Sequence, residues 1–136
     1  DDPVKRKCLN DIVHPEITKM INLQVKRIKA ECPDAIIIIE AALLVETGTH
    51  KEYEKLIVVY SREELQEERM ITRDGITRGE ARKRIDSQWP IVKKMKVADY
   101  LIQNEGSLEQ LSRDTERVFA SLRTLSDLNN IQKGDS

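Results

Sequence analysis

The apolar residues near the start of the chain repeat at the spacing of a helix. Four of them share one face: Ile17, Ile21, Val25 and Ile28. This repeat predicts a helix from about Pro15 to Glu31, because proline suits the first turn of a helix. Residues 1–15 also have the character of a helical region, so we expect the chain to be a piece of a longer protein.

Three short apolar runs indicate strands. Residues 35–40 (AIIIIE) and 56–60 (LIVVY) are apolar without alternation, which is typical of parallel strands covered on both faces. Residues 98–104 (ADYLIQN) predict a third strand, and the segment between the first two is predicted as a loop with at most a short helix. Strands separated by helices indicate a layered α/β fold with a mostly parallel sheet, in a single domain.

Two capping patterns predict a helical hairpin between the second and third strands. SREE, residues 61–64, predicts a reciprocal capping box and a helix to about Thr72, which residues 74–75 (DG) then break. TRGE, residues 77–80, predicts a second capping box and a helix that ends before Pro90.

A final helix is predicted after the third strand, with Ser107 as its cap. Its apolar face is regular: Leu108, Leu111, Thr115, Val118, Leu122 and Leu125. We expect residues 126–136 to be a frayed tail.

Composition limits the classes of function. Lys and Arg total 23 and Asp and Glu 24, so the net charge of −1 gives no reason to expect nucleic acid as a partner. Cys8 and Cys32 lack the spacing of a zinc site or disulfide scaffold, which favours a reducing, cytoplasmic setting. No apolar run approaches the ~20 residues that span a bilayer, and we expect a soluble protein without a membrane partner.

Positive charge is concentrated in the predicted hairpin. Residues 72–94 carry seven basic side chains against three acidic ones. Helical spacing places two sets on one face each: Gln66, Arg69 and Arg73 on the first helix, and Arg84 and Gln88 on the second. Guanidinium groups from two helices could converge on phosphate, which arginine binds bidentately, and a mobile hairpin could exclude water. The alternative is an ordinary solvated surface.

Other candidate residues lie at strand and helix ends. Glu40 closes the first predicted strand, where ligands bind in open α/β sheets, and Glu46 follows a few residues later. Glu40 could orient a substrate hydroxyl or hold magnesium through water, or it could simply pair with a nearby arginine. His14 could contact a ligand or cap a helix. No glycine lies in a GxxxxGK[ST] or GxGxxG frame, so the sequence contains no phosphate-cradling loop.

Five segments together resemble the dephospho-coenzyme A kinase family in their order and spacing. They are VHPEI (13–17), IEAALLVETG (39–48), LIVVYSREELQEERMITRDG (56–75), EARKRIDSQWP (80–90) and ADYLIQNEGS (98–107). The resemblance covers residues 1–125, and the motifs are specific as a set.

The resemblance implies a P-loop kinase-like, three-layer α/β/α fold with a mostly parallel sheet and a helical lid at about 73–94. It implies transfer of the γ-phosphate of ATP, with Mg²⁺, to the ribose 3′-hydroxyl of dephospho-coenzyme A, the last step of coenzyme A biosynthesis. Arg73 and Arg84 would then be the catalytic phosphate contacts of the lid. Arg69, Gln88 and Lys94 match family positions without an implied contact.

Six further residues receive an implied place. These are His14 and Pro15 near the acceptor substrate, Glu40 and Glu46 in the substrate loop after a core strand, and Asn104 and Gly106 beside the adenine of ATP. No metal ligand is implied for this chain. Glu40 and Ala42 replace the Asp and Pro of a D-x-P-L-L frame that the family often has, which changes the expected geometry there.

The family's first strand, its P-loop and the segment with the catalytic aspartate have no counterpart in this sequence. The resemblance places that strand between residues 36–40 and 56–60, so we expect a gap in the sheet, and self-association of the fragment through it is an open possibility. We expect residues 1–136 alone to lack appreciable kinase activity. Two alternatives stay open: another nucleotide kinase, or a non-catalytic interaction module derived from a kinase.

Overall fold

The computed structural model describes residues 2–134. The chain divides into two compact units, Asp1–Ile39 with Leu125–Ser136, and Glu40–Thr124. The second unit contains both strands and the charged helices of residues 63–95. The candidate site is therefore built within one unit.

The first unit begins with helix α1 (Pro3–Glu31), which is much longer than predicted. Asp2 caps it, since its carboxylate accepts a hydrogen bond from the Val4 backbone N–H at 3.0 Å. The predicted start at Pro15 is wrong, because the cap and first-turn proline lie at residues 2 and 3 and Pro15 lies inside the helix. An internal proline removes one backbone hydrogen bond, which the rest of this long helix outweighs. The predicted end at Glu31 is confirmed.

Residues 35–40 form no strand, so this prediction is wrong. A strand needs a neighbour that accepts and donates its backbone hydrogen bonds, and the sheet of the described residues has two strands, both later in the chain. The resemblance placed a further strand between this segment and residues 56–60. Without that strand, the apolar run has nothing to pair with.

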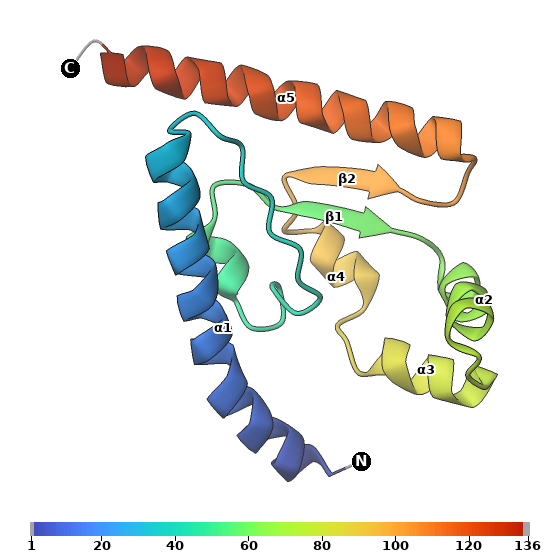
Figure 1. The fold of residues 1–136 in the computed structure, drawn as a ribbon. Helices are drawn as coiled ribbons and strands as arrows, with labels where there is room; N and C mark the ends of the chain where they lie inside the picture. Colours follow the sequence, from blue (N-terminus) through green and yellow to red (C-terminus); the bar gives the residue numbers. More distant parts are fainter. Residues whose placement is uncertain (1, 135–136) are drawn as a thin grey trace. The chain divides into compact units, whose positions relative to one another are not determined.

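Strands β1 (Ile57–Tyr60) and β2 (Tyr100–Gln103) lie side by side in parallel (Figure 1). The register pairs Ile57 with Tyr100 at the start of both strands. These strands confirm the predictions at 56–60 and 98–104, and with the surrounding helices they confirm the α/β class.

Asp99 fixes this register from the residue before β2. Its carboxylate accepts hydrogen bonds from Lys55 Nζ at 2.9 Å and from the Leu56 backbone N–H at 2.8 Å. The bond from Lys55 and the bond from Leu56 outweigh desolvation and lower the pKa of Asp99. The carboxylate therefore stays ionised and continues to hold the two strands in register near neutral pH.

Neither face of this small sheet is fully covered. Val58 and Ile102 are buried, whereas their partners across the register, Leu101 and Val59, are exposed. The expectation that both strands are covered on both faces is therefore only half met, because two strands offer too little surface to bury. Among residues 2–134, no helix is both long and apolar enough to cross a membrane.

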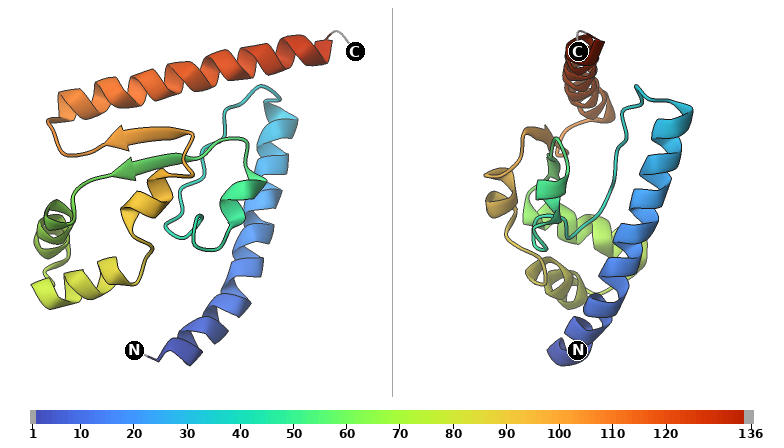
Figure 2. Two further views of the ribbon diagram at one scale, coloured as in Figure 1. Left: turned by 180° about the vertical axis from the view of Figure 1, so that it is seen from behind. Right: turned by 90° about the vertical axis from the view of Figure 1, so that its left-hand side faces the viewer.

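Four helical segments of the second unit lie before or between the two strands in the chain: one precedes β1, and three connect β1 to β2. They are η1 (Thr49–Glu52), α2 (Glu63–Asp74), α3 (Arg78–Asp86) and α4 (Ile91–Met95). The first confirms the short helix expected in that loop. α2 and α3 pack against each other, as both views of Figure 2 show, and this confirms the helical hairpin.

The two predicted capping boxes have opposite outcomes. Thr77 and Glu80 form the box as predicted: the Thr77 backbone N–H donates to Glu80 Oε2 at 2.8 Å, and the Glu80 N–H donates to Thr77 Oγ1 at 3.3 Å. The box predicted at Ser61 is wrong, because α2 begins one residue later with Arg62 as its N-cap. The Arg62 backbone N–H instead donates to Glu105 at 2.6 Å, a partner 43 residues away.

Helix α5 (Leu108–Gly134) begins where the sequence predicts, with the Gln110 N–H donating to Ser107 Oγ at 3.3 Å. It continues to Gly134, beyond Ser126, where we expected a frayed tail. Val118 on its predicted apolar face is buried, but Leu108 and Thr115 on that face are exposed. The apolar repeat thus identified the helix correctly. Fewer residues of its predicted apolar face are buried than the repeat indicates.

Candidate functional site

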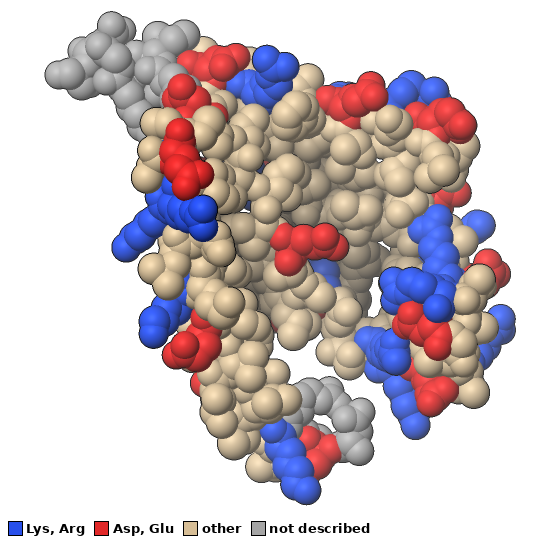
Figure 3. Space-filling view, in the orientation of Figure 1, with Lys and Arg blue, Asp and Glu red and all other residues tan. Residues whose placement is uncertain are grey.

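A cavity of about 440 Å³ lies among α2, α3 and the segment that leads into α4. Its polar lining comes from all three: Gln66 and Arg73 of α2, Arg84 of α3, Gln88 before α4 and Lys94 within α4, with the acidic Glu63 and Asp86. Lysine and arginine side chains gather over α2 and α3, with acidic side chains between them (Figure 3). The structure thus brings together Arg73 and Arg84, which the sequence placed on two helix faces, whereas Arg69 of the same predicted set lies outside the cavity lining.

Arg73 and Arg84 share one carboxylate, that of Asp74. The Arg73 Nε donates to Asp74 Oδ1 at 2.7 Å and its Nη2 to Oδ2 at 3.2 Å, while the Arg84 Nη1 donates to Oδ2 at 2.7 Å. The hydrogen bond from Arg73 is the main cause that lowers the pKa of Asp74, with Arg84 adding to it. Two cations and one anion leave this cluster with one net positive charge, which suits a further anion.

The acidic residues of the cavity have a cation of their own. Arg82 of α3 pairs with Glu63 at 3.1 Å, Glu67 at 3.0 Å and Asp86 at 3.5 Å. Glu67 is buried, and Arg78 also approaches it at 3.8 Å. These pairs hold α3 against α2. Two arginines against three acids leave this set with one net negative charge, but Glu63 and Asp86 pair with Arg82 rather than with Arg73 or Arg84.

Lys94 is held in place by Glu46. The Lys94 Nζ lies 2.7 Å from Glu46 Oε1, and the two side chains are only 12% and 13% exposed. Lys94 also donates to Gln88 Oε1 at 2.8 Å, and Glu46 accepts from the Trp89 backbone N–H at 3.0 Å. Burial raises the pKa of Glu46, but the bonds from Lys94 and Trp89 outweigh it and lower the pKa overall. Glu46 thus orders the segment that carries Gln88 and Lys94.

The residues after β2 are linked to α2 rather than to the cavity. Arg69 Nη1 donates to the Asn104 carbonyl oxygen at 3.0 Å, and the Asn104 N–H donates to the Tyr60 oxygen at 2.8 Å. A Cβ added at Gly106 would lie 3.6 Å from the Gln110 side chain on α5. The geometry therefore gives Asn104 a structural contact, and the adenine-side role of Asn104 and Gly106 stays a prediction.

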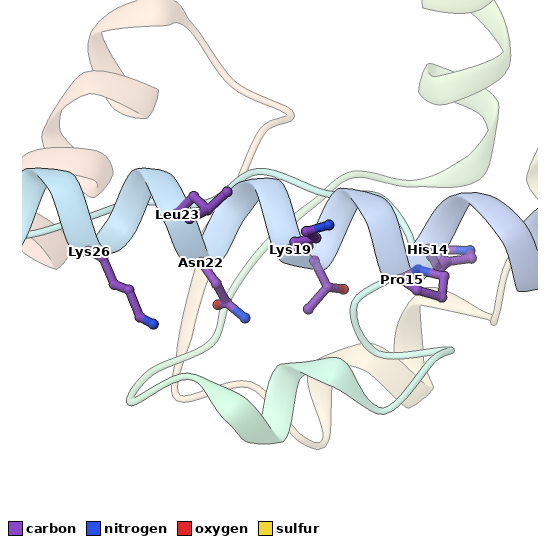
Figure 4. Close-up of a pocket in the computed structure, with 7 residues that line it drawn as sticks. His14, Pro15, Lys19, Asn22, Leu23 and Lys26 are labelled. Atoms are coloured by element: carbon purple, nitrogen blue, oxygen red, sulfur yellow. The ribbon is translucent and has the colours of Figure 1, made fainter.

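The acceptor-side residues lie in the other unit or outside the cavity lining. His14 and Pro15 line a pocket on α1 whose remaining walls also come from that helix, including Lys19 and Lys26 (Figure 4). Glu40 is exposed. Substrate contacts by His14, Pro15, Glu40 and Glu46 remain predictions.

The pairing of three acidic residues in this region was not predicted from the sequence. Asp74 was identified as a helix breaker, although its neighbour Arg73 was a local signal for pairing. Glu67 accepts a hydrogen bond from the Arg82 side chain, and Glu105 accepts one from the Arg62 backbone N–H. Because these partners are 15 and 43 residues apart, the local sequence gives no signal for either bond. Among the described residues, no group of three or more His, Cys, Asp or Glu side chains is placed to hold a metal ion.

Comparisons with known proteins point to one family. The dephospho-CoA kinase family model matches residues 1–110. A dephospho-CoA kinase of Aquifex aeolicus is 40% identical over 121 residues, which cover 89% of this chain and 60% of that protein. One of Fusobacterium nucleatum is 41% identical over 118 residues, covering 87% of this chain and 59% of that protein.

Two solved structures have the same fold over most of the chain. TT1252 from Thermus thermophilus superposes with a TM-score of 0.75 at 32% identity, covering 90% of this chain and 62% of that one. Dephospho-CoA kinase from Campylobacter jejuni gives a TM-score of 0.61 at 28% identity, covering 90% of this chain and 60% of that one. The chain thus spans about 60% of the length of the relatives that it matches. It belongs to the dephospho-CoA kinase family.

Proposed function

We propose that the native protein carrying this chain transfers the γ-phosphate of ATP to the ribose 3′-hydroxyl of dephospho-CoA. One observation carries the proposal: in a member of the dephospho-CoA kinase family, Arg73 of α2 and Arg84 of α3 line one cavity and share a single counter-ion. Phosphoryl transfer requires positive groups that meet the charge on the moving phosphoryl group. The residues of the α2–α3 hairpin supply them.

The remaining residues have roles consistent with this reaction. Lys94, ordered by Glu46, adds a third cation to the lining of the cavity, and Gln88 adds an amide. His14 and Pro15 would lie at the acceptor and Asn104 with Gly106 beside the adenine, as in the family. The α2–α3 hairpin would act as the lid that excludes water from the transfer.

Magnesium, if bound with ATP, would supply positive charge against the phosphates. Such ions are commonly held by one or two carboxylates together with the phosphates. Residues 2–134 place no cluster of three acidic, histidine or cysteine side chains together, and we assign no magnesium ligand to this chain.

A direct assay tests the proposal. The native protein is incubated with ATP, magnesium and dephospho-CoA, and the product is identified by chromatography and mass spectrometry as the 3′-phosphorylated form. A panel of nucleoside monophosphates is tested in parallel. Phosphorylation of a nucleoside monophosphate but not of dephospho-CoA would favour another nucleotide kinase, and no turnover of any acceptor would favour an interaction module.

Residues 1–136 expressed alone are the matched control. Their sequence contains no GxxxxGK[ST] loop, so the β- and γ-phosphates have no backbone cradle in this chain. We expect no appreciable turnover from the control under conditions in which the native protein is active. Turnover comparable to that of the native protein would contradict the roles assigned here.

A further inference from the structure

Asp74 occupies a position that is unfavourable for a carboxylate by itself. It is the last residue of α2, and the C-terminus of a helix carries partial negative charge that repels an acid. Its pairs with Arg73 and Arg84 compensate for this repulsion. The pair with Arg73 is local, whereas the pair with Arg84 joins the end of α2 to α3 across the turn at Gly75.

The carboxylate lies behind the guanidinium groups. The Asp74 side chain is 23% exposed, while Arg73 and Arg84 are 75% and 55% exposed. Both arginines line the cavity of the α2–α3 hairpin, and Asp74 is not part of that lining. A guanidinium group has five N–H donors, and Asp74 engages two of Arg73 and one of Arg84. Each arginine therefore retains donors for a ligand that approaches from the cavity.

The shared carboxylate also counters the repulsion between the two cations. Two guanidinium groups that bond to one carboxylate lie close together, and like charges at such a distance repel. Without an anion between them, Arg84, which is more than half exposed, would be free to turn toward solvent. With Asp74 present, the pair is assembled before a ligand arrives, which lowers the entropic cost of binding one.

We propose that Asp74 is a positioning residue that holds Arg84 beside Arg73, so that both guanidinium groups meet one phosphate group. The inference rests on the proposed function, in which that phosphate belongs to ATP. The opposite role is that Asp74 occupies the place of the phosphate and competes with it. The two roles predict opposite effects when the negative charge is removed.

The experiment measures binding of tripolyphosphate to the native protein by isothermal titration calorimetry, for the wild type, Asp74→Asn, Arg84→Ala and the double variant. Asp74→Asn is expected to weaken tripolyphosphate binding about tenfold, because one charge-assisted contact to the ligand is lost. This loss is expected although the substitution removes a negative charge from the neighbourhood of an anion. In the Arg84→Ala background the same change is expected to cause no further loss of affinity, because the proposed loss acts through Arg84. The turnover number with ATP and dephospho-CoA should follow the same pattern.

Glu68→Gln is the matched control. It removes one negative charge from an exposed position of α2, outside both the cavity lining and the Asp74 cluster, and should leave tripolyphosphate binding within about twofold. Asp74→Glu restores a carboxylate and is expected to recover most of the lost affinity. Circular dichroism of each variant checks the fold.

Several results would overturn the proposal. Tighter binding by Asp74→Asn would make Asp74 a competitor, and unchanged binding would leave it no role. An equal loss in the Arg84→Ala background, an Asp74→Glu variant as weak as Asp74→Asn, or a wild type that does not bind tripolyphosphate would also contradict it. If the binding pattern holds while dephospho-CoA is not phosphorylated, the positioning role stands and the proposed function fails.

Discussion

Arg82 and Arg84 lie two residues apart on α3 and are almost equally exposed, at 51% and 55%, but they belong to different regions of the hairpin. Arg82 pairs with the buried Glu67 and with Glu63. Arg84 lines the cavity and pairs with Asp74, the last residue of α2. Exposure therefore does not separate the arginine that joins the two helices from the arginine that we propose as a phosphate contact. The partner does: a buried acid in one case, and an acid shared with a second arginine in the other.

The two arginine clusters of the hairpin differ in the charge that they leave for a ligand. In the Arg82 cluster one arginine pairs with three acids and holds α3 on α2, so the cluster offers no free positive charge to an anionic ligand. The Arg73–Asp74–Arg84 cluster keeps one net positive charge facing the cavity. Substitutions that act on one cluster and spare the other can therefore test the assignment.

Arg84→Ala should give the largest effect. We expect the turnover number of the native protein to fall about 100-fold or more, because a lost donor to developing charge typically costs that much. The KM for dephospho-CoA should change far less, since the charge that Arg84 meets develops during transfer. Steady-state kinetics with both substrates measure the two parameters. An unchanged turnover number would mean that this cluster is an ordinary solvated surface without a role in phosphoryl transfer.

Arg82→Ala should show the reverse behaviour. It leaves Glu67 buried with only the more distant Arg78, so we expect the melting temperature of the native protein to fall by about 5 °C. Turnover measured well below that temperature should stay close to the wild-type value. Calorimetry gives the melting temperature, and combining the change with Glu67→Gln should restore part of the loss, because the stranded charge is then gone.

Glu46→Gln should produce a smaller loss that depends on pH. The folded protein lowers the pKa of Glu46 below its usual 4.5, so its ion pair with Lys94 stabilises the fold above that value and is lost as the pH falls through the lowered pKa. We expect the variant to be less stable by about 1.5 kcal/mol at pH 7, with a difference that disappears in acid. Urea unfolding at several pH values measures it, and a difference independent of pH would contradict the ion pair.

Local signals in the sequence predicted much of this region. The Thr77–Glu80 box, the turn at Gly75 and the strands predicted at 56–60 and 98–104 depend on residues close together in the chain. All are confirmed, the strands as Ile57–Tyr60 and Tyr100–Gln103. Of the residues that helical spacing grouped, Gln66, Arg73, Arg84 and Gln88 line the cavity, and Arg69 does not.

The errors came from partners that the local sequence does not reveal. The Ser61 box failed because Glu105, far along the chain, accepts the N–H at the start of α2. Residues 35–40 have strand composition but no strand to pair with among the described residues. The link from Asp74 to Arg84 required the geometry of the hairpin, since spacing on a single helix does not predict a contact between helices.

Thr77→Ala gives the smallest expected effect and tests what the two clusters share. Thr77 caps α3, which carries both Arg82 and Arg84, and its hydroxyl accepts the Glu80 N–H. Losing such a cap costs about 1 kcal/mol of stability. Because both arginines depend on the same helix, the variant should lower stability modestly, by urea unfolding, and reduce turnover no more than a few-fold, far less than Arg84→Ala. A loss of turnover as large as that of Arg84→Ala would mean that the start of α3 positions the guanidinium groups. The difference between the two clusters would then depend on the placement of α3 and not on their acidic partners.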